Sequence, residues 1–505
     1  MTLHADAPPP YGAFLDHVRR LSYVDDAASV LDWDQQVMMP DAGTPARAKQ
    51  KAALSTLEHD LLTDEDLAES LDALGDADLT ADRAAVVREV RRKHDRARRV
   101  PEALIERISE ATSNALPVWE DARAEADFGA FEGTLAELVD LKREYAAAVD
   151  PDRDPYEVLF EDYEPYLGLD TAERILARLG ETLPDLVAAI KETEATLADP
   201  FEGTYDEADQ RALVESVLDE LGYDRNRGRL DISTHPFTSG TQFDARITTR
   251  FTPADPLDGL GSTVHEFGHA TYVLGLPRER YGTPLGESRD MTVHESQSRF
   301  WENHVGRSRA FWERFAPHVE DHLGVAAGPR ACYEAANAIS PDSPIRVEAD
   351  ELTYHMHVLL RFEIERDLVR GDLDPAEVPA VWNEKMAEYL GIDPADDAEG
   401  CLQDIHWTHA AFGYFPTYTL GSVLAAQLDA AVRADLPVDE HVRAGEFDPI
   451  REWMGERIHR HGCRYTTPEL VREATGGPLT ADHFLGYATE KYGSLYGLSH
   501  RGYPS

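Results

Sequence analysis

Residues 255–277 read Asp-Pro-Leu-Asp-Gly-Leu-Gly-Ser-Thr-Val-His-Glu-Phe-Gly-His-Ala-Thr-Tyr-Val-Leu-Gly-Leu-Pro, a stretch that predicts a well-delimited helix. Asp255 is a good N-cap and Pro256 fits the first helical position, while Gly275 and Pro277 are typical of a helix end. Between them, apolar side chains recur at helical spacing, at Leu260, Val264, Phe267 and Leu274. We therefore expect a partly buried helix here.

The polar residues of this helix form the pattern His265-Glu266-x-x-His269, and Glu295 follows downstream in His294-Glu295-Ser296-Gln297. Histidines at i and i+4 lie on one face of a helix, so both imidazoles can reach one metal ion. Two nitrogens and one carboxylate oxygen, with an open fourth position, are the ligand set of a catalytic zinc site. Glu266 is placed to accept a proton from water at such a site. The pattern therefore predicts a zinc hydrolase first.

Each part of this pattern has a simpler interpretation. His-Glu-x-x-His is short and arises by chance, although two buried imidazoles beside a buried glutamate would be costly without a metal or other partners. Thr292-x-x-Glu295 also fits a capping box, in which the glutamate only accepts a backbone N–H. We favour Glu295 as the third ligand, with Glu302 and Glu287 as the alternatives.

The charge of the chain is strongly negative. Lys and Arg total 49 against 95 Asp and Glu, which gives a formal charge of −46 over 505 residues. Such a charge argues against nucleic acid or an anionic membrane surface as a partner. Because a chain this acidic repels itself unless salt screens it, we expect a halophilic protein from a salt-rich cytoplasm.

The cysteines and the N-terminus indicate a cytoplasmic protein. Cys332, Cys401 and Cys463 are odd in number and far apart, so no disulfide framework is expected. The N-terminus lacks the basic-then-apolar pattern of a signal peptide, and no apolar run is long enough to cross a membrane. We expect a soluble protein with no membrane partner.

Helical periodicity covers most of the chain, so the predicted fold class is mainly α. Helices are expected at 11–35, 44–60, 79–98, 101–115, 116–150, 170–198, 205–222, 291–305, 345–370, 375–390, 407–432, 447–460, 466–474 and 480–492. Residues 229–251 instead carry β-branched residues around a Thr/Ser/Gly stretch, which predicts a small antiparallel hairpin beside the metal helix. We expect a single domain over 1–505, with 1–150 as an N-terminal helical wall or lid and 151–505 as the catalytic body.

Candidate transition-state donors cluster downstream, around a break marked by glycine. They are His406, His409, Tyr414 and Tyr418. A single buried His or Tyr is more often a satisfied core residue, but the density of this group favours a site. Hydrolysis of a peptide needs such donors aimed where negative charge develops.

Two arginines are candidates for binding a carboxylate, because a guanidinium donates two parallel hydrogen bonds. Arg346 is predicted to open a helix, and its simpler interpretation is a surface ion pair with Glu348 or Asp350. Arg246 in the predicted hairpin has the same ambiguity.

Two further histidine pairs are assigned no role. His355 and His357 alternate along a helix, and we expect His459 and His461 at a solvated helix end.

Taken together, the motifs resemble the carboxypeptidase Taq family of zinc metallocarboxypeptidases. The resemblance rests on the ordered segments Leu31-Asp32-Trp33-Asp34-Gln35 with Met39-Pro40, His235-Pro236-Phe237, Asp244-Ala245-Arg246-Ile247-Thr248, 265–269, 294–297, 345–350 and 400–407. It implies His265, His269 and Glu295 as ligands of one zinc ion per subunit, for which cobalt could substitute. It implies Glu266 as the general base.

The resemblance also implies roles for the other polar candidates. Arg346 would bind the C-terminal carboxylate of the substrate, and His406 and Tyr414 would stabilise the transition state. His235 and Arg246 would line the site. The implied protein is an elongated helical homodimer with a deep active-site groove. The implied activity is the removal of C-terminal residues from peptides, with broad specificity and with proline disfavoured.

The chain departs from the family pattern at two points. Residues 286–291 are more polar than expected before the third ligand, which bears on substrate preference. A zinc histidine also needs a carboxylate or carbonyl partner for its second ring nitrogen. Arg299 occupies the position one turn after Glu295, so this partner must come from elsewhere in the chain.

Two other functions remain open. A zinc oligopeptidase of related helical fold would cut internal bonds, and would not need a C-terminal carboxylate. A non-catalytic helical scaffold with structural zinc would need a fourth protein ligand, and the three cysteines are not spaced to supply one.

Overall fold

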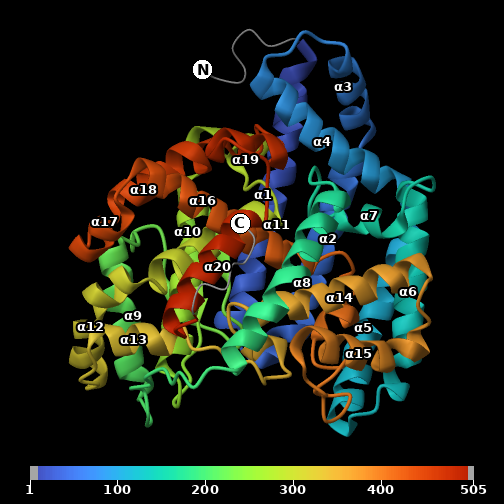
Figure 1. The fold of residues 1–505 in the computed structure, drawn as a ribbon. Coiled ribbons are helices and arrows are strands. Elements are labelled where there is room, and N and C mark those ends of the chain that lie inside the picture. Colours follow the sequence, from blue (N-terminus) through green and yellow to red (C-terminus); the bar gives the residue numbers. More distant parts are fainter. Residues whose placement is uncertain (1–8, 499–505) are drawn as a thin grey trace.

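The computed structural model describes residues 9–498 and is built almost entirely of helices (Figure 1). The N-terminal half contains α1 (Pro9–Val37), α2 (Thr44–Thr63), α3 (Glu65–Gly75), α4 (Ala81–Arg99), α5 (Glu102–Glu125), α6 (Gly129–Val149), α7 (Pro155–Phe160), α8 (Leu169–Lys191) and α9 (Glu207–Leu221). Three short strands follow, β1 (Leu230–Ile232), β2 (Thr238–Thr241) and β3 (Asp244–Thr249).

The C-terminal half begins with the long helix α10 (Pro256–Gly275) and α11 (Met291–Arg299), which continues as a π-helical turn (Phe300–Gly306). The remaining helices are α12 (Arg309–Leu323), α13 (Pro329–Ala336), α14 (Thr353–Arg370), α15 (Val378–Leu390), α16 (Pro416–Asp435), α17 (Val438–Ala444), α18 (Asp448–Arg457), α19 (Thr467–Thr475) and α20 (Asp482–Leu495). The mainly α prediction is confirmed.

The sheet differs from the predicted hairpin. Its strand order is β1-β3-β2, with β1 parallel to β3 and β2 antiparallel to β3, so that Leu230 and Thr238 both lie opposite Ile247. The Thr/Ser/Gly stretch, expected to be a turn, is itself the edge strand β2. Because β2 reverses the chain once more, the two predicted strands run parallel, and the sheet is mixed rather than purely antiparallel.

Several helix boundaries also differ from the prediction. The expected break near 115 is absent, because α5 runs on through Pro117 with Ala115 and Trp119 buried in the core. The chain breaks instead at Ala126, which adopts a left-handed conformation. The helices α3, α7, α12, α13 and α17 were not predicted.

Arg346 stands outside the helix predicted for it at 345–370, and the helix predicted at 407–432 begins only at Pro416. Arg346 lies in a short 3-10 turn, and α14 begins only at Thr353 because Asp350 accepts hydrogen bonds from the N–H groups that start it. His406 lies in the 3-10 turn Ile405–His409, which ends at the left-handed Ala410. Both side chains are therefore presented by turns.

The buried apolar residues form two separate clusters. The larger one extends from Val100 to Tyr496 and includes residues of α10, α11, α14 and α16. The smaller one joins α1, α3 and α4, with Leu285 as its contribution from the C-terminal half. In Figure 1, α3 and α4 stand at one end of the molecule, beyond the main body. The N-terminal helices therefore have a core of their own.

Three helices approach closely around the polar pattern of α10. The predicted cap is present, with the Asp255 carboxylate accepting the N–H groups of Leu257 and Asp258. A Cβ on Gly268 would lie 2.5 Å from Ser298 Cα of α11, and a Cβ on Gly421 of α16 would lie 2.5 Å from Glu295 Cγ. Because both positions are glycine, α10 and α16 can pack directly against α11.

The cysteine prediction can be compared with the structure. Cys332, Cys401 and Cys463 are all unpaired and buried. Among residues 9–498, no helix combines the length and apolar character needed to cross a bilayer.

Candidate metal centre

His265, His269 and Glu295 come together where α10 packs on α11. One ligand atom from each lies within 4.8 Å of the other two. Glu295 Oε2 is 3.7 Å from His265 Nε2 and 3.5 Å from His269 Nε2. Ligands about 2.0–2.1 Å from a tetrahedral zinc ion stand roughly 3.4 Å apart. The donor set and its spacing therefore fit a divalent metal ion with an open coordination position.

The second nitrogen of each imidazole has a partner. His265 Nδ1 lies 2.8 Å from Glu302 Oε2, and His269 Nδ1 lies 2.6 Å from His294 Nδ1. Burial and the neighbouring His269 lower the pKa of His294 to about 3, so His294 is neutral. These contacts hold both Nε2 atoms toward Glu295, as metal-binding histidines require.

The two carboxylates of this centre are kept ionised by arginines. Glu295 accepts a hydrogen bond from Arg299 at 2.7 Å, and Glu302 accepts from Arg299 at 3.1 Å and from Arg307 at 2.8 Å. Burial alone would raise the pKa of each carboxyl, but these guanidinium groups and the histidines hold both pKa values below the ordinary range. Both carboxylates are therefore anionic at neutral pH.

The alternatives to Glu295 as a ligand are placed elsewhere. Asp290, not Thr292, is the N-cap of α11, so the predicted capping box is not formed. Glu287 instead lies 3.4 Å from Lys93 Nζ. Glu302 contacts His265 on its Nδ1 side, so it supplies the carboxylate partner that the sequence left unassigned. Its position two helical turns after Glu295 was the signal for it.

Glu266 lies beside the three ligand residues and is buried. Its Oε2 accepts a hydrogen bond from the Thr238 hydroxyl at 2.6 Å, and the same hydroxyl lies 3.0 Å from the Glu266 carbonyl oxygen. Thr238 belongs to β2, so the edge strand fixes the orientation of this carboxylate. The sequence did not point to Thr238, because its strand was expected to be a turn.

Arg346 is buried and is not paired with Glu348 or Asp350. Its Nε and Nη2 donate to the Asp404 carboxylate at 2.9 and 2.7 Å, and its Nη1 donates to the Tyr354 hydroxyl at 3.2 Å. The ring of Tyr354 also lies 5.1 Å from the Arg299 guanidinium. The contacts therefore run from Arg346 through Tyr354 and Arg299 to Glu295.

His406 and Tyr414 belong to one group of aromatic rings. Their centroids are 5.9 Å apart, and Tyr414 also contacts Tyr418 and Tyr163, each at 5.1 Å. The Arg346 guanidinium lies 5.7 Å from the Tyr418 ring, which places this group beside Arg346. Burial lowers the pKa of His406 to about 3 and raises that of Tyr414, so both are neutral donors.

Among residues 9–498, neither His235 nor Arg246 contacts any of the three ligand residues. His235 is exposed between β1 and β2. Arg246 pairs with Asp244 at 2.6 Å and lies 4.2 Å from the ring of Trp33 on α1. Arg246 therefore joins the sheet to the N-terminal helices.

The prediction for His459 was wrong. His459 is buried, and its Nε2 lies 2.9 Å from Gln297 Oε1 on α11. The chain after α18 folds back onto α10, where Gly275 leaves room for the imidazole. His461 is half-buried, and His355 contacts the Thr419 hydroxyl at 3.0 Å.

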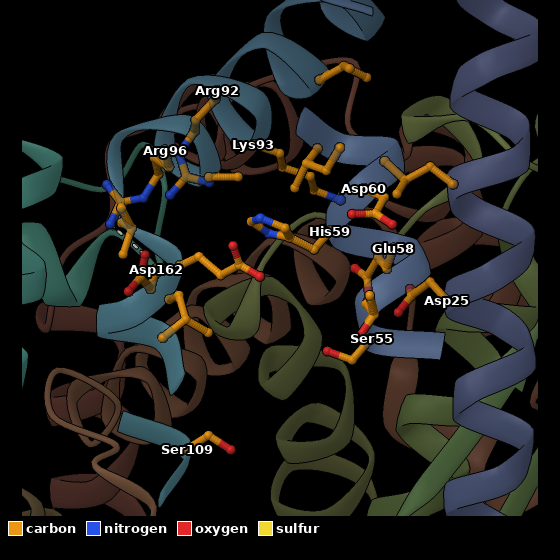
Figure 2. Close-up of a pocket in the computed structure, with 18 of the residues that line it drawn as sticks. Asp25, Ser55, Glu58, His59, Asp60, Arg92, Lys93, Arg96, Ser109 and Asp162 are labelled. Carbon is orange, nitrogen blue, oxygen red and sulfur yellow. Dashed lines mark hydrogen bonds and ion pairs between the residues drawn. The ribbon is translucent and has the colours of Figure 1, made fainter. Parts of the chain in front are cut away.

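A cavity of about 970 Å³ lies along the N-terminal helices. Figure 2 shows Arg92, Lys93 and Arg96 of α4 on one side, and Glu58 and Asp60 of α2 on the other. None of the three ligand residues lines this cavity. Its lining includes Asp162, whose neighbour Tyr163 contacts Tyr414, and Glu287, which lies before α11.

Known proteins that are similar to this chain are carboxypeptidases. A family model described as carboxypeptidase Taq (M32) metallopeptidase matches residues 13–492. Thermostable carboxypeptidase 1 of Thermus thermophilus is 38% identical over 509 residues, covering 96% of this chain and 99% of that protein. Carboxypeptidase 1 of Bacillus subtilis is 34% identical over 490 residues, covering 96% and 98%.

Solved structures show the same fold. The structure of Pyrococcus furiosus carboxypeptidase has a TM-score of 0.93 at 37% identity, covering 96% of this chain and 99% of that one. The M32 carboxypeptidase of Deinococcus radiodurans R1 has a TM-score of 0.94 at 34% identity, covering 97% and 100%. The resemblance seen in the motifs is confirmed. The chain therefore belongs to the carboxypeptidase Taq (M32) family of metallopeptidases, and it is a metallocarboxypeptidase that hydrolyses peptide bonds.

Proposed function

We propose that this chain removes C-terminal residues from peptides one at a time, with one zinc ion per subunit held by His265, His269 and Glu295. The observation that carries the proposal is the meeting of two fixed Nε2 atoms and an ionised carboxylate oxygen within 4.8 Å. Cobalt offers the same preference for nitrogen and oxygen ligands and could replace zinc.

Each neighbouring side chain has a part in the reaction. A zinc ion in this site supplies a Lewis acid for the scissile carbonyl and lowers the pKa of water to about 7. Glu266, held by Thr238, accepts the proton of the attacking water and returns it to the leaving amine. His406 and Tyr414, as neutral donors, hydrogen-bond the oxygen that becomes negative.

Substrate binding involves both sides of the metal centre. Arg346 is proposed to bind the C-terminal carboxylate, since it lies one tyrosine away from Arg299 and Glu295. His235 and Arg246 are proposed to line the far edge of the site, although neither contacts the ligand residues. The cavity of about 970 Å³ along the N-terminal helices offers room for the part of the peptide upstream of the scissile bond. We therefore expect broad specificity for the sequence of that part. Proline next to that bond is expected to be disfavoured.

The test is a matched pair of peptides that differ only in a free or amidated C-terminus. Each is digested with metal-loaded and with chelated protein, and the products are identified by mass. Stepwise shortening of the free acid, with much slower cleavage of the amide and no cleavage of either after chelation, is the expected result. Equal cleavage of both peptides at internal bonds would instead identify a zinc oligopeptidase.

The proposal extends to the setting of the protein. We expect a homodimer in a salt-rich cytoplasm, on the basis of the family and of the −46 formal charge. Residues 1–150 would form the wall of the groove and 151–505 the catalytic body of a single domain. The separate apolar cluster of α1, α3 and α4 is compatible with a wall that moves as a unit.

A further inference from the structure

The guanidinium of Arg346 is already partly used within the protein. Of its five N–H groups, one on Nε and one on Nη2 are donated to Asp404, and one on Nη1 to Tyr354. Asp404 also neutralises the charge of Arg346, and Arg346 in turn holds the pKa of Asp404 below its ordinary range. A substrate carboxylate at Arg346 would therefore find only two unused N–H groups and little net charge.

Tyr354 stands at the edge of Arg346 where those donors remain. Its hydroxyl oxygen accepts from Nη1 at 3.2 Å, which leaves the hydroxyl proton free to be donated. Its ring lies between two guanidinium groups, 5.6 Å from that of Arg346 and 5.1 Å from that of Arg299. Burial raises the pKa of Tyr354 in spite of these two cations, so the hydroxyl stays protonated at neutral pH.

A cavity of about 350 Å³ opens on the same residues. Arg346, Tyr354, Tyr418 and Arg299 line it together with Glu302. Arg299 contacts Glu295, and Glu302 contacts His265, so two residues that line the cavity each contact a candidate metal ligand. The cavity is large enough for the terminal residue of a peptide whose scissile bond lies at the metal ligands.

We propose that the Tyr354 hydroxyl donates a hydrogen bond to the C-terminal carboxylate of the substrate, beside Arg346, and so takes part in recognising a free C-terminus. A carboxylate offers about four lone-pair sites, so it can accept from Tyr354 and from the two remaining N–H groups of Arg346 at once. This inference rests on the proposed carboxypeptidase function and names a binding residue for it.

The test compares Tyr354→Phe with the wild type on the same peptide as free acid and as amide. The phenylalanine ring keeps its place between the two guanidinium groups and removes only the hydroxyl. Loss of a hydrogen bond to a charged group costs on the order of 10-fold in binding. We therefore expect KM for the free acid to rise about 10-fold with kcat within about twofold, and the slower cleavage of the amide to be unchanged.

Tyr389→Phe is the matched control. Its hydroxyl also bonds a charged group, Glu363 Oε2 at 2.9 Å, but it does not line the cavity. This variant should discriminate free acid from amide as the wild type does. As a measurement that needs no turnover, inhibition by a free amino acid should weaken in Tyr354→Phe, and inhibition by its amide should not.

Three results would overturn the inference. If Tyr354→Phe loses activity equally on acid and amide, the residue only maintains the structure around Arg346. If it keeps the discrimination of the wild type, the hydroxyl does not contact the carboxylate. If the wild type itself cleaves both peptides equally, the proposed function fails and this inference fails with it, so the two failures are distinguishable.

Discussion

The short contact between His294 and His269 sets the geometry of the metal centre at the scale of single residues. The two Nδ1 atoms are 2.6 Å apart, and burial lowers the pKa of His294 to about 3. One ring must therefore donate and the other accept. If His269 donates from Nδ1, its Nε2 keeps the lone pair that a metal ion needs. We therefore expect His294 to position the candidate ligand His269, as we expect Glu302 to position His265.

Replacing His294 gives a first prediction. His294→Ala should weaken metal affinity about 10- to 100-fold, the usual effect of losing a partner of a metal ligand. Competition with a chelator of known affinity measures the change, and His294→Asn should recover part of it through an amide hydrogen bond. His441→Ala, on the distant α17, is the control. An unchanged affinity in His294→Ala would show that the contact has no positioning role.

The proposed base gives a second prediction. Glu266→Gln should lower kcat at least ~100-fold, because general base assistance contributes 10²–10⁴-fold. The variant should keep its metal, since Glu266 is not among the three grouped ligands. Metal content and peptide hydrolysis are measured on the same sample. Full activity with bound metal would remove Glu266 from the mechanism.

The residue-scale contacts were only partly predictable from the sequence. His265, His269 and Glu266 follow from helical spacing, which is a local property. Glu302 could be predicted only as an alternative ligand. The roles of His294 and Thr238 could not be predicted, because their contacts depend on how α11 and β2 dock against α10. For the same reason, Arg346 could not be matched with Asp404, which lies 58 positions away in the sequence.

At the scale of elements, the packing of α10 on α11 decides whether the ligands meet. Gly268 of α10 faces α11 so closely that a Cβ there would lie 2.5 Å from Gln297 O and from Ser298 Cα. Both of these are backbone atoms, which cannot move without shifting the helix. The distance between the histidines and Glu295 therefore depends on the absence of a side chain at this position.

A substitution at this contact gives the third prediction. Gly268→Ala should lower stability by about 1–3 kcal/mol through overpacking and also weaken metal binding. Gly261→Ala, on the same helix but with nothing within 4 Å of the added Cβ, should be neutral or up to ~1 kcal/mol stabilising. Thermal unfolding and chelator competition on both variants provide the test. Equal behaviour of the two variants would mean that α10 and α11 are not in such close contact.

The predictions for the elements were most accurate where local signals are strong. Asp255-Pro256 and Gly275 mark the ends of α10 correctly, because caps act on the adjacent backbone. The sheet was misassigned because Ser239 and Gly240, at the centre of β2, do not favour a strand, and β2 is held by its pairing with β3. The helix α5 continues through Pro117 because its apolar face is buried, an effect of tertiary packing.

At the scale of the whole molecule, the excess of acidic residues dominates. A formal charge of −46 destabilises a compact state through self-repulsion, which salt screens. Many of the arginines are paired across elements, such as Arg289 with Glu89, which joins the segment before α11 to α4. Pairs of this kind tie the N-terminal helices to the body, while the unpaired acidic surface repels itself.

This gives the fourth prediction. The apparent melting temperature should rise as KCl increases from about 0.01 M to about 1 M, since the Debye length falls from about 30 Å to about 3 Å. An uncharged solute at the same osmolality is the control and should have a smaller effect. Equal stability at both salt concentrations would contradict the halophilic interpretation of the charge.

The sequence predicts the fold class of the whole molecule, but not the arrangement of its helices. Periodicity predicts a mainly α chain, but not that α1, α3 and α4 have their own apolar cluster. That cluster depends on long-range contacts, including Leu285 from the segment between α10 and α11. The long cavity beside it was likewise not visible in any single motif.

We expect His265, His269 and Glu295 together to hold one zinc ion. Crystals grown with zinc, and diffraction recorded on both sides of the zinc absorption edge, provide the test. We predict a single strong anomalous peak per subunit, about 2.0–2.2 Å from both Nε2 atoms and a Glu295 oxygen, with a solvent molecule as a further ligand. A peak elsewhere, or a Glu295 side chain turned away from the two histidines, would contradict it.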